Sequence, residues 1–197
     1  MENKKLLEEI RSYWNNRADG YSRVNQEELH SEQKEKWKEV LLEQLPKKEK
    51  DQVQILDIGT GPGFFAILLA EEGYQVTAVD YTEQMLQEAK SNAADLADQI
   101  SFKRMDAQNL EFPKETFDYI VTRNVTWNLE HPKRAYREWQ RVLKPGGKIL
   151  NFDANWYAYL YDDKLKLGYE QDRQRAKEEQ EELIDRMLDE MIESSKK

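Results

Sequence analysis

The sequence predicts an α/β domain in which helices cover both faces of a doubly wound, mostly parallel sheet. Two observations lead to this prediction: short apolar runs alternate with helix-like segments, and glycine turns fall in the gaps between them. Chains that alternate strand and helix in this way form parallel sheets with crossover connections. The five expected strands span residues 53–58, 75–79, 100–103, 117–122 and 148–152.

Helices are expected at both ends of the chain. Residues 3–16 and 31–45 place apolar side chains at helical spacing, and Pro46 ends the second pattern before the first strand. After Tyr161 the chain becomes strongly charged, and a narrow apolar stripe over residues 183–192 predicts a long solvated helix.

These patterns divide one domain into three parts. Residues 1–46 form an N-terminal helical cap, residues 47–160 form the core, and residues 161–197 form a charged helical extension. A length of 197 residues fits a single domain with a well-buried core.

The composition disfavours several classes of protein. The 30 Lys and Arg residues against 39 Asp and Glu give a net charge of -9, which offers no basic surface for nucleic acid. The absence of cysteine excludes disulfides, thiolate metal sites and cysteine nucleophiles. Neither a signal peptide nor a membrane-spanning segment is present in the sequence. We therefore expect a cytoplasmic protein without nucleic-acid or membrane partners and without a metal site.

A glycine turn follows the first expected strand and opens into a helix. Gly59, Gly61 and Gly63 let a ligand approach the backbone, and the helix start adds free amides and a positive dipole end. The second strand ends at Asp80, a carboxylate that can accept the hydroxyl protons of a ribose. The alternative role of Asp80 is to cap the following helix. Together the turn and the acid favour an adenosine-bearing ligand.

The spacing also bears on which adenosine ligand is bound. The dinucleotide fingerprint requires its third glycine at position 64, where Phe64 stands. Asp57, two residues before the first glycine, would repel a pyrophosphate and suits a ligand with an ammonium group. S-adenosylmethionine combines an amino-acid end, a ribose and an adenine, and the sequence favours it over a nicotinamide dinucleotide.

Several motifs, in order, resemble those of class I S-adenosylmethionine-dependent methyltransferases. Residues 57–63 resemble the first motif, residues 80–86 the second and residues 104–108 the third, and the resemblance extends over about residues 13–152. It implies a Rossmann-like fold, S-adenosylmethionine as cofactor, S-adenosylhomocysteine as product and a small molecule as methyl acceptor. The cofactor-binding residues that it implies are Tyr21, Asp57, Gly59, Thr60, Gly61, Gly63, Asp80, Tyr81, Met85, Asp106, Ala107 and Arg123.

The same resemblance implies roles for some of these residues. Asp106 would meet the amino group of adenine, the backbone of Ala107 would meet a ring nitrogen, and Tyr81 would pack on the ring. Tyr21 belongs to an aromatic segment that closes over the cofactor in many small-molecule methyltransferases. Simple packing of this segment on the edge of the sheet is an equal alternative.

No catalytic residue is assigned, because methyl transfer from a sulfonium mainly requires alignment and exclusion of water. His30 and His131 are both expected at the surface. Residues 123–126 resemble a loop of the ubiquinone and menaquinone C-methyltransferases, which makes quinone precursors one option for the acceptor. The candidate substrate residues, in the loops after the fourth and fifth strands, are Asn124, Trp127, Asp153, Trp156 and Tyr157. Trp127 suits a place in the core equally well.

Two alternative functions stay open: a regulatory module that binds S-adenosylmethionine without turnover, and a nicotinamide-dependent oxidoreductase. The resemblance further implies two strands after the fifth, which the sequence does not contain. The fifth strand would then lie at an open edge. We expect either that the chain is part of a longer protein or that a second copy covers this edge as a homodimer, through the stripe at residues 183–192.

Overall fold

The computed structural model describes residues 2–155, 158–175 and 177–178. It divides into two compact units, Met1–Asp153 and Ala154–Lys197, and each is considered by itself. In the part of the chain that is described, no helix is both long enough and apolar enough to cross a membrane.

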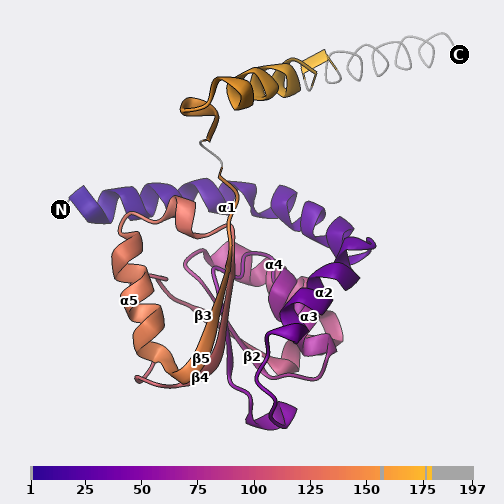
Figure 1. The fold of residues 1–197 in the computed structure, drawn as a ribbon, viewed down its shortest axis with the longest axis vertical. Coiled ribbons are helices and arrows are strands. Elements are labelled where there is room, and N and C mark those ends of the chain that lie inside the picture. Colours follow the sequence, from indigo (N-terminus) through magenta and orange to yellow (C-terminus); the bar gives the residue numbers. More distant parts are fainter. Residues whose placement is uncertain (1, 156–157, 176, 179–197) are drawn as a thin grey trace, which may run out of the picture. The chain divides into compact units, whose positions relative to one another are not determined.

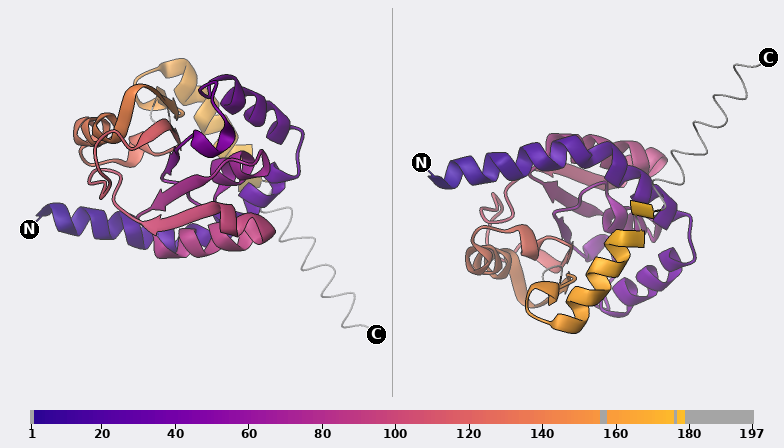
Figure 2. Two further views of the ribbon diagram at one scale, coloured as in Figure 1. Left: turned by 90° about the horizontal axis from the view of Figure 1, so that it is seen from below. Right: turned by 90° about the horizontal axis from the view of Figure 1, so that it is seen from above.

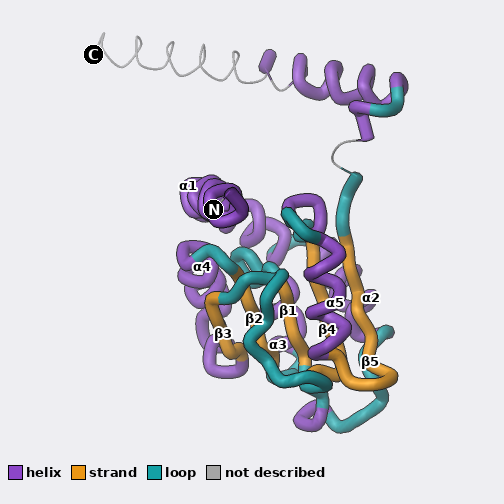
Figure 3. The backbone as a smooth tube through the Cα atoms, turned by 90° about the vertical axis from the view of Figure 1, so that its left-hand side faces the viewer, coloured by secondary structure: helices purple, strands orange, loops and turns teal. Residues whose placement is uncertain are grey.

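The first unit is built on a parallel sheet with the strand order β3-β2-β1-β4-β5 (Figure 3). The alternation of apolar runs and helices therefore predicted the fold class correctly. The strands are β1 (Ile55–Ile58), β2 (Val76–Asp80), β3 (Ile100–Arg104), β4 (Phe117–Arg123) and β5 (Leu143–Phe152).

Helices cover both faces of this sheet, as expected. Neighbouring residues of β1 point to opposite faces, because side chains alternate along a strand. Ile55 packs in one core cluster with α2 (Gln33–Glu43) and α3 (Phe64–Glu71). Leu56 packs in the other with α5 (Pro132–Val142), whose Ala135, Trp139 and Val142 are fully buried. Each face thus has its own apolar layer.

β5 begins five residues earlier than the sequence predicts. Leu143 already pairs with Phe117, and a register shift follows before the pairing resumes at Lys148. Pro145, Gly146 and Gly147, whose residue types are typical of a turn, therefore form an irregular part of the strand. Gly147 is required there, since a Cβ at this position would lie 2.9 Å from the carbonyl oxygen of Asp118.

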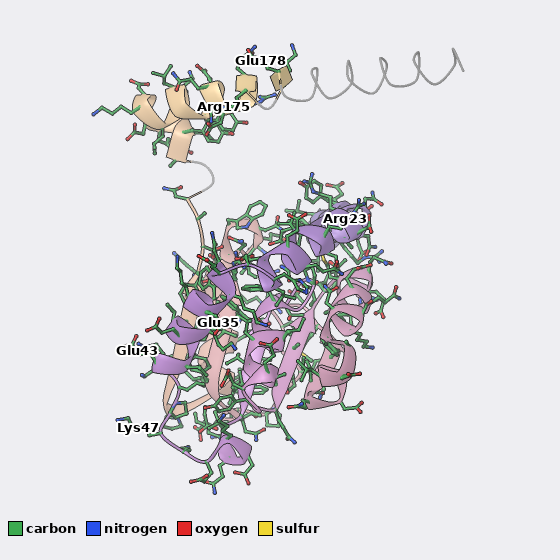
Figure 4. The ribbon with its side chains drawn as sticks, turned by 90° about the vertical axis from the view of Figure 1, so that its right-hand side faces the viewer. Arg23, Glu35, Glu43, Lys47, Arg175 and Glu178 are labelled. Carbon is green, nitrogen blue, oxygen red and sulfur yellow. The ribbon has the colours of Figure 1, made fainter. Side chains whose placement is uncertain are left out.

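The N-terminal helix, α1, is longer than predicted and runs over Glu2–Leu29. Figure 1 shows α1 lying across one end of the sheet, and Figure 2 shows it beside α4 (Glu83–Ala93) in both views. Gly20 does not interrupt the helix, and a Cβ there would meet no atom within 4 Å apart from the neighbouring backbone of the helix itself. Figure 4 shows Arg23 on the outer side of α1, where 71% of its side chain is exposed.

The second unit contains the helical residues 163–175 and 177–178, within the expected charged extension. The stripe over residues 183–192 lies outside the described residues. In the described chain, β5 pairs with β4 alone, and no strand follows it.

Candidate functional site

A cleft opens at the carboxyl ends of the strands, between the sheet and α1. The pairing of Ile58 with both Val79 and Thr122 brings the ends of β1, β2 and β4 level, so that the loops after them meet. In a doubly wound sheet this is where ligands bind. The cleft measures about 1090 Å³ with its solvent-open part included, which suits a small organic molecule.

The glycine turn after β1 forms the floor of the cleft. Gly59 and Gly61 have φ angles of +65° and +53°, a conformation that favours glycine. A Cβ on Gly61 would lie 3.6 Å from the ring of Tyr21, so α1 passes close above the turn. Gly63 does not line the cleft: a Cβ there would lie 3.1 Å from the Cβ of Ala89, which makes it a contact between α3 and α4.

Asp57 is a buried carboxyl at the end of β1. Its Oδ2 accepts hydrogen bonds from the hydroxyl of Thr60 at 2.6 Å and from the amide of Ala66 at 3.1 Å. Burial raises the pKa of Asp57 to about 7, with the charge of Asp80 adding to the rise and the two hydrogen bonds opposing it. Asp57 lines the cleft while it fixes the turn and the start of α3.

Asp80 at the end of β2 joins the glycine turn to the next helix. One carboxylate oxygen accepts from the amide of Gly61 at 2.9 Å, and the other accepts from the amide of Thr82 at 2.8 Å. Burial raises the pKa of Asp80, and these two amides oppose the rise. Asp80 therefore satisfies the amide at the start of α4, and it also lines the cleft. This geometry is compatible with both roles that the sequence left open for Asp80, which are binding of a ribose and capping of the following helix.

The ends of β2 and β3 form one side wall, with Tyr81, Met85, Asp106 and Ala107 at the cleft. The hydroxyl of Tyr81 donates a hydrogen bond to Glu8 of α1 at 3.0 Å. This bond ties the N-terminal half of α1 to the wall.

The end of β4 forms the opposite wall. Both terminal nitrogens of the Arg123 guanidinium donate to the carboxylate of Glu28 at 2.9 Å, which makes a bidentate pair. The guanidinium carbon also lies 4.8 Å from the ring centre of Trp37 and 5.0 Å from that of Phe64. Arg123 reaches the cleft, but its donors are directed at α1.

The expected substrate residues are only partly brought together at the cleft. Asn124 lines it, at a φ of +57°. Trp127 donates to the carbonyl of Asn124 at 2.8 Å, and Asp153 accepts from the amide of Thr126 at 3.0 Å. Trp127 and Asp153 are not part of the lining and instead hold the β4 loop in shape. Trp156 and Tyr157 lie outside the described residues.

Sequence reasoning missed much of the wall that α1 supplies. Leu7, Ile10, Trp14 and Asn25 reach the cleft from the same face of the helix as Tyr21, which was expected at the cofactor. Spacings of three, four and seven residues place them on a common stripe, and this signal was available in the sequence. The expected helix ended at residue 16, so the sequence did not predict a cleft face on the second half of α1. Other lining residues that were not singled out are Pro62, Phe65, Thr82, Met105, Gln108, Val125, Asn128, Leu129 and Glu130.

Asn92 of α4 connects α1 with the glycine turn. Its amide nitrogen donates to the carbonyl of Pro62 at 3.0 Å and to the hydroxyl of Ser22 at 3.1 Å. Its amide oxygen accepts from Gln26 at 2.7 Å. The Asn92 side chain thus holds α1 against the glycine turn that forms the floor of the cleft.

Comparison with known proteins agrees with this arrangement. A family model described as a methyltransferase domain matches residues 56–151. A ubiquinone biosynthesis O-methyltransferase from Coxiella burnetii is 31% identical over 109 residues, which are 54% of this chain and 47% of that protein. A ubiquinone/menaquinone biosynthesis C-methyltransferase from Rickettsia massiliae is 31% identical over 69% of this chain and 54% of its own length. The chain thus spans about half the length of these relatives.

Among solved structures, a phosphoethanolamine N-methyltransferase from Haemonchus contortus is similar, with a TM-score of 0.52 and 30% identity. The match covers 59% of this chain and 27% of that one. That structure contains S-adenosylhomocysteine and phosphomonomethylethanolamine.

Proposed function

Because residues 56–151 form a methyltransferase domain of the class I S-adenosylmethionine-dependent family, we propose that this protein transfers a methyl group from S-adenosylmethionine to a small molecule. The observation that carries the proposal is one cleft that unites the glycine turn, the carboxylates that end β1, β2 and β3, and the face of α1.

The charge of the cleft supports a cationic cofactor. Asp57, Asp80, Asp106 and Glu130 line it, whereas Arg123 is the single basic residue among the described lining residues and is paired with Glu28. S-adenosylmethionine carries a positive sulfonium and an ammonium group, which such a cleft attracts. The two phosphates of a nicotinamide dinucleotide would meet acidic walls without a free basic partner among these residues, which disfavours the oxidoreductase alternative.

The residues present fit each part of the cofactor. We assign the ribose to Asp80, which lines the cleft at the end of β2 and whose oxygens also accept from two backbone amides. Tyr81, Met85 and Ala107 supply a wall for a flat adenine ring. We assign the amino-acid end to the part of the cleft that Gly59, Gly61 and Tyr21 border.

The mechanism that follows is one of alignment. The bound cofactor supplies an electrophilic methyl group on sulfur. Leu7, Ile10 and Trp14 of α1 cover the cleft and exclude water, while the β4 loop around Asn124 borders the space into which an acceptor would enter. Alignment of two reactants can supply much of the rate enhancement of such a displacement. Neither His30 nor His131 lines the cleft, and no base is assigned.

We propose a small, largely apolar acceptor, with quinone precursors as the first compounds to test. The support is the apolar and aromatic lining and the similarity to proteins named for quinone biosynthesis. The test incubates the full chain with S-adenosylmethionine and an acceptor panel, and measures the S-adenosylhomocysteine formed above the rate without acceptor.

We expect one acceptor class to give turnover, and we expect Asp80→Ala to lower turnover at subsaturating cofactor. The lost hydrogen bonds to a charged group correspond to a roughly 10- to 150-fold loss of cofactor affinity. Cofactor binding without turnover on any acceptor would favour the regulatory module instead. Hydride transfer from a nicotinamide cofactor would contradict the proposal.

A further inference from the structure

Asn25 presents an unexplained polar atom at the cofactor cleft. Its side chain is 6% exposed and belongs to the cleft lining, and its amide oxygen Oδ1 is buried without a hydrogen-bond partner. Buried amide oxygens are almost always paired, because leaving one unpaired costs stability. A ligand atom in the cleft would resolve this.

The position of Asn25 on α1 places it above the glycine turn. It lies one helical turn after Tyr21, whose ring is 3.6 Å from where a Cβ of Gly61 would be. It lies three residues before Glu28, which holds Arg123 at the end of β4. Arg23, on the outer side of the helix, marks the opposite face (Figure 4). Asn25 therefore faces the region between the turn and the end of β4.

Several other acceptor atoms in this region already accept hydrogen bonds. Oδ2 of Asp57 accepts from Thr60 and Ala66, and both oxygens of Asp80 accept from backbone amides. The carboxylate of Glu28 accepts from Arg123. The Oδ1 atom of Asn25 is an acceptor with unused capacity in a place where a cationic N–H group would find one.

We propose that Asn25 is a positioning residue for the amino-acid end of S-adenosylmethionine, whose ammonium group donates a hydrogen bond to Oδ1. The proposal rests on the proposed function, since it assumes this cofactor. Asn25 thus anchors the amino-acid end of the cofactor from the side of α1.

The test compares two ligands that differ in the group concerned. S-adenosylhomocysteine contains the amino-acid end, whereas 5′-methylthioadenosine keeps the adenine, the ribose and the sulfur but lacks that end. Calorimetry on the full chain measures both dissociation constants for the wild type, Asn25→Leu and Asn25→Asp. Asn15→Leu is the matched control, because Asn15 of α1 also has a buried, unpartnered Oδ1 but does not line the cleft.

We expect Asn25→Leu to weaken S-adenosylhomocysteine about 10-fold or more and to leave 5′-methylthioadenosine within about twofold, as expected for a lost hydrogen bond to a charged group. Asn25→Asp keeps an acceptor and should retain affinity for S-adenosylhomocysteine. Asn15→Leu should change neither constant. If Asn25→Leu does not fold, Asn25→Ser is measured with the same two ligands and the same expectation.

Equal losses for both ligands, or no loss for either, would overturn the proposal. A stronger loss in Asn25→Asp than in Asn25→Leu would also overturn it, because it would place a carboxylate rather than an ammonium group at this side chain. A wild-type chain that binds neither ligand would instead contradict the proposed function itself.

Discussion

Asp57 shows how one side chain can serve both the fold and the cleft. Its carboxyl is 2% exposed and holds the glycine turn to the start of α3 through Thr60 and Ala66. A charged carboxylate in this place is costly, so burial shifts its titration toward neutral pH. The stability of the folded protein therefore depends on whether Asp57 is protonated.

The pH dependence of stability follows from that shift. The pKa of Asp57 rises from 3.8 to about 7 on folding, so the folded state binds the extra proton between these values. The resulting stability is fully present below pH 4 and is lost as pH rises through 7, by at most about 4 kcal/mol. We expect Asp57→Asn to remove this dependence.

Thermal unfolding of the ligand-free protein at a series of pH values between 4 and 8 checks this. Asp80, whose pKa is raised in the same direction, is present in both proteins, so the difference between the two curves reports Asp57 together with its charge coupling to Asp80. Parallel curves for the wild type and Asp57→Asn would show that Asp57 does not titrate in this range.

Gly61 and Gly63 allow a glycine in the cleft lining to be compared with a glycine of the same turn outside the lining. Gly61→Ala puts a methyl group into the cleft at a φ of +53°, which costs about 1–2 kcal/mol of stability for an L-residue. We expect a modest loss of stability and a large loss of S-adenosylhomocysteine binding.

Gly63→Ala is the matched control, because its methyl group would press on Ala89 outside the cleft lining. We expect it to lower the melting temperature at least as much, while the folded protein still binds S-adenosylhomocysteine. Similar binding losses in both variants would show that the turn acts only through its conformation.

At the scale of elements, α1 is the part of the site that the sequence predicted least well. The glycine turn and Asp80 could be predicted because each is set by a few adjacent residues at a strand end. The cleft face of α1 depends on which side of a long helix meets the sheet. Gly20 and the polar residues around it interrupt the apolar spacing, so the sequence did not predict that the helix continues beyond residue 16. The pairing of Glu28 with Arg123, 95 residues apart, had no local signal.

The Glu28–Arg123 pair should hold α1 closed over the cleft. The side chains are 16% and 25% exposed, and the pair is bidentate and flanked by aromatic rings, which distinguishes it from a solvated ion pair. A double-mutant cycle with Glu28→Ala and Arg123→Ala should give a coupling energy of roughly 0.5–3 kcal/mol. Amide exchange in the C-terminal half of α1 should also become faster.

The exposed pair Asp19–Arg23 on the same helix serves as the control, with a coupling close to zero expected. Equal coupling in the two cycles, or unchanged exchange in α1, would mean that the Arg123 pair does not hold the helix in place.

At the scale of the whole molecule, the sequence predicted five strands and their parallel direction, because that information lies in the alternation of apolar runs with helical segments. It did not predict the start of β5, since Pro145 and the glycines after it suggested a turn. Those residues remain paired with β4 through a register shift that only the neighbouring strand determines.

At the outer edge of β5 we expect either further strands of a longer protein or a second copy of the chain to pair, because an unpaired strand edge readily accepts another strand. The second copy is the alternative that can be tested with this chain alone. Light scattering should then give twice the 23.5 kDa mass of one chain, and dilution should speed amide exchange along β5. A monomer at all concentrations would contradict this expectation.

The central claim is that the cleft between α1 and the carboxyl ends of the strands binds S-adenosylmethionine. The most direct test is calorimetric titration of the full chain with S-adenosylhomocysteine and, separately, with NADH. We expect one S-adenosylhomocysteine to bind per chain, Asp80→Ala to weaken this binding, and NADH not to bind. Binding of NADH in place of S-adenosylhomocysteine, or of neither compound, would contradict the proposed function.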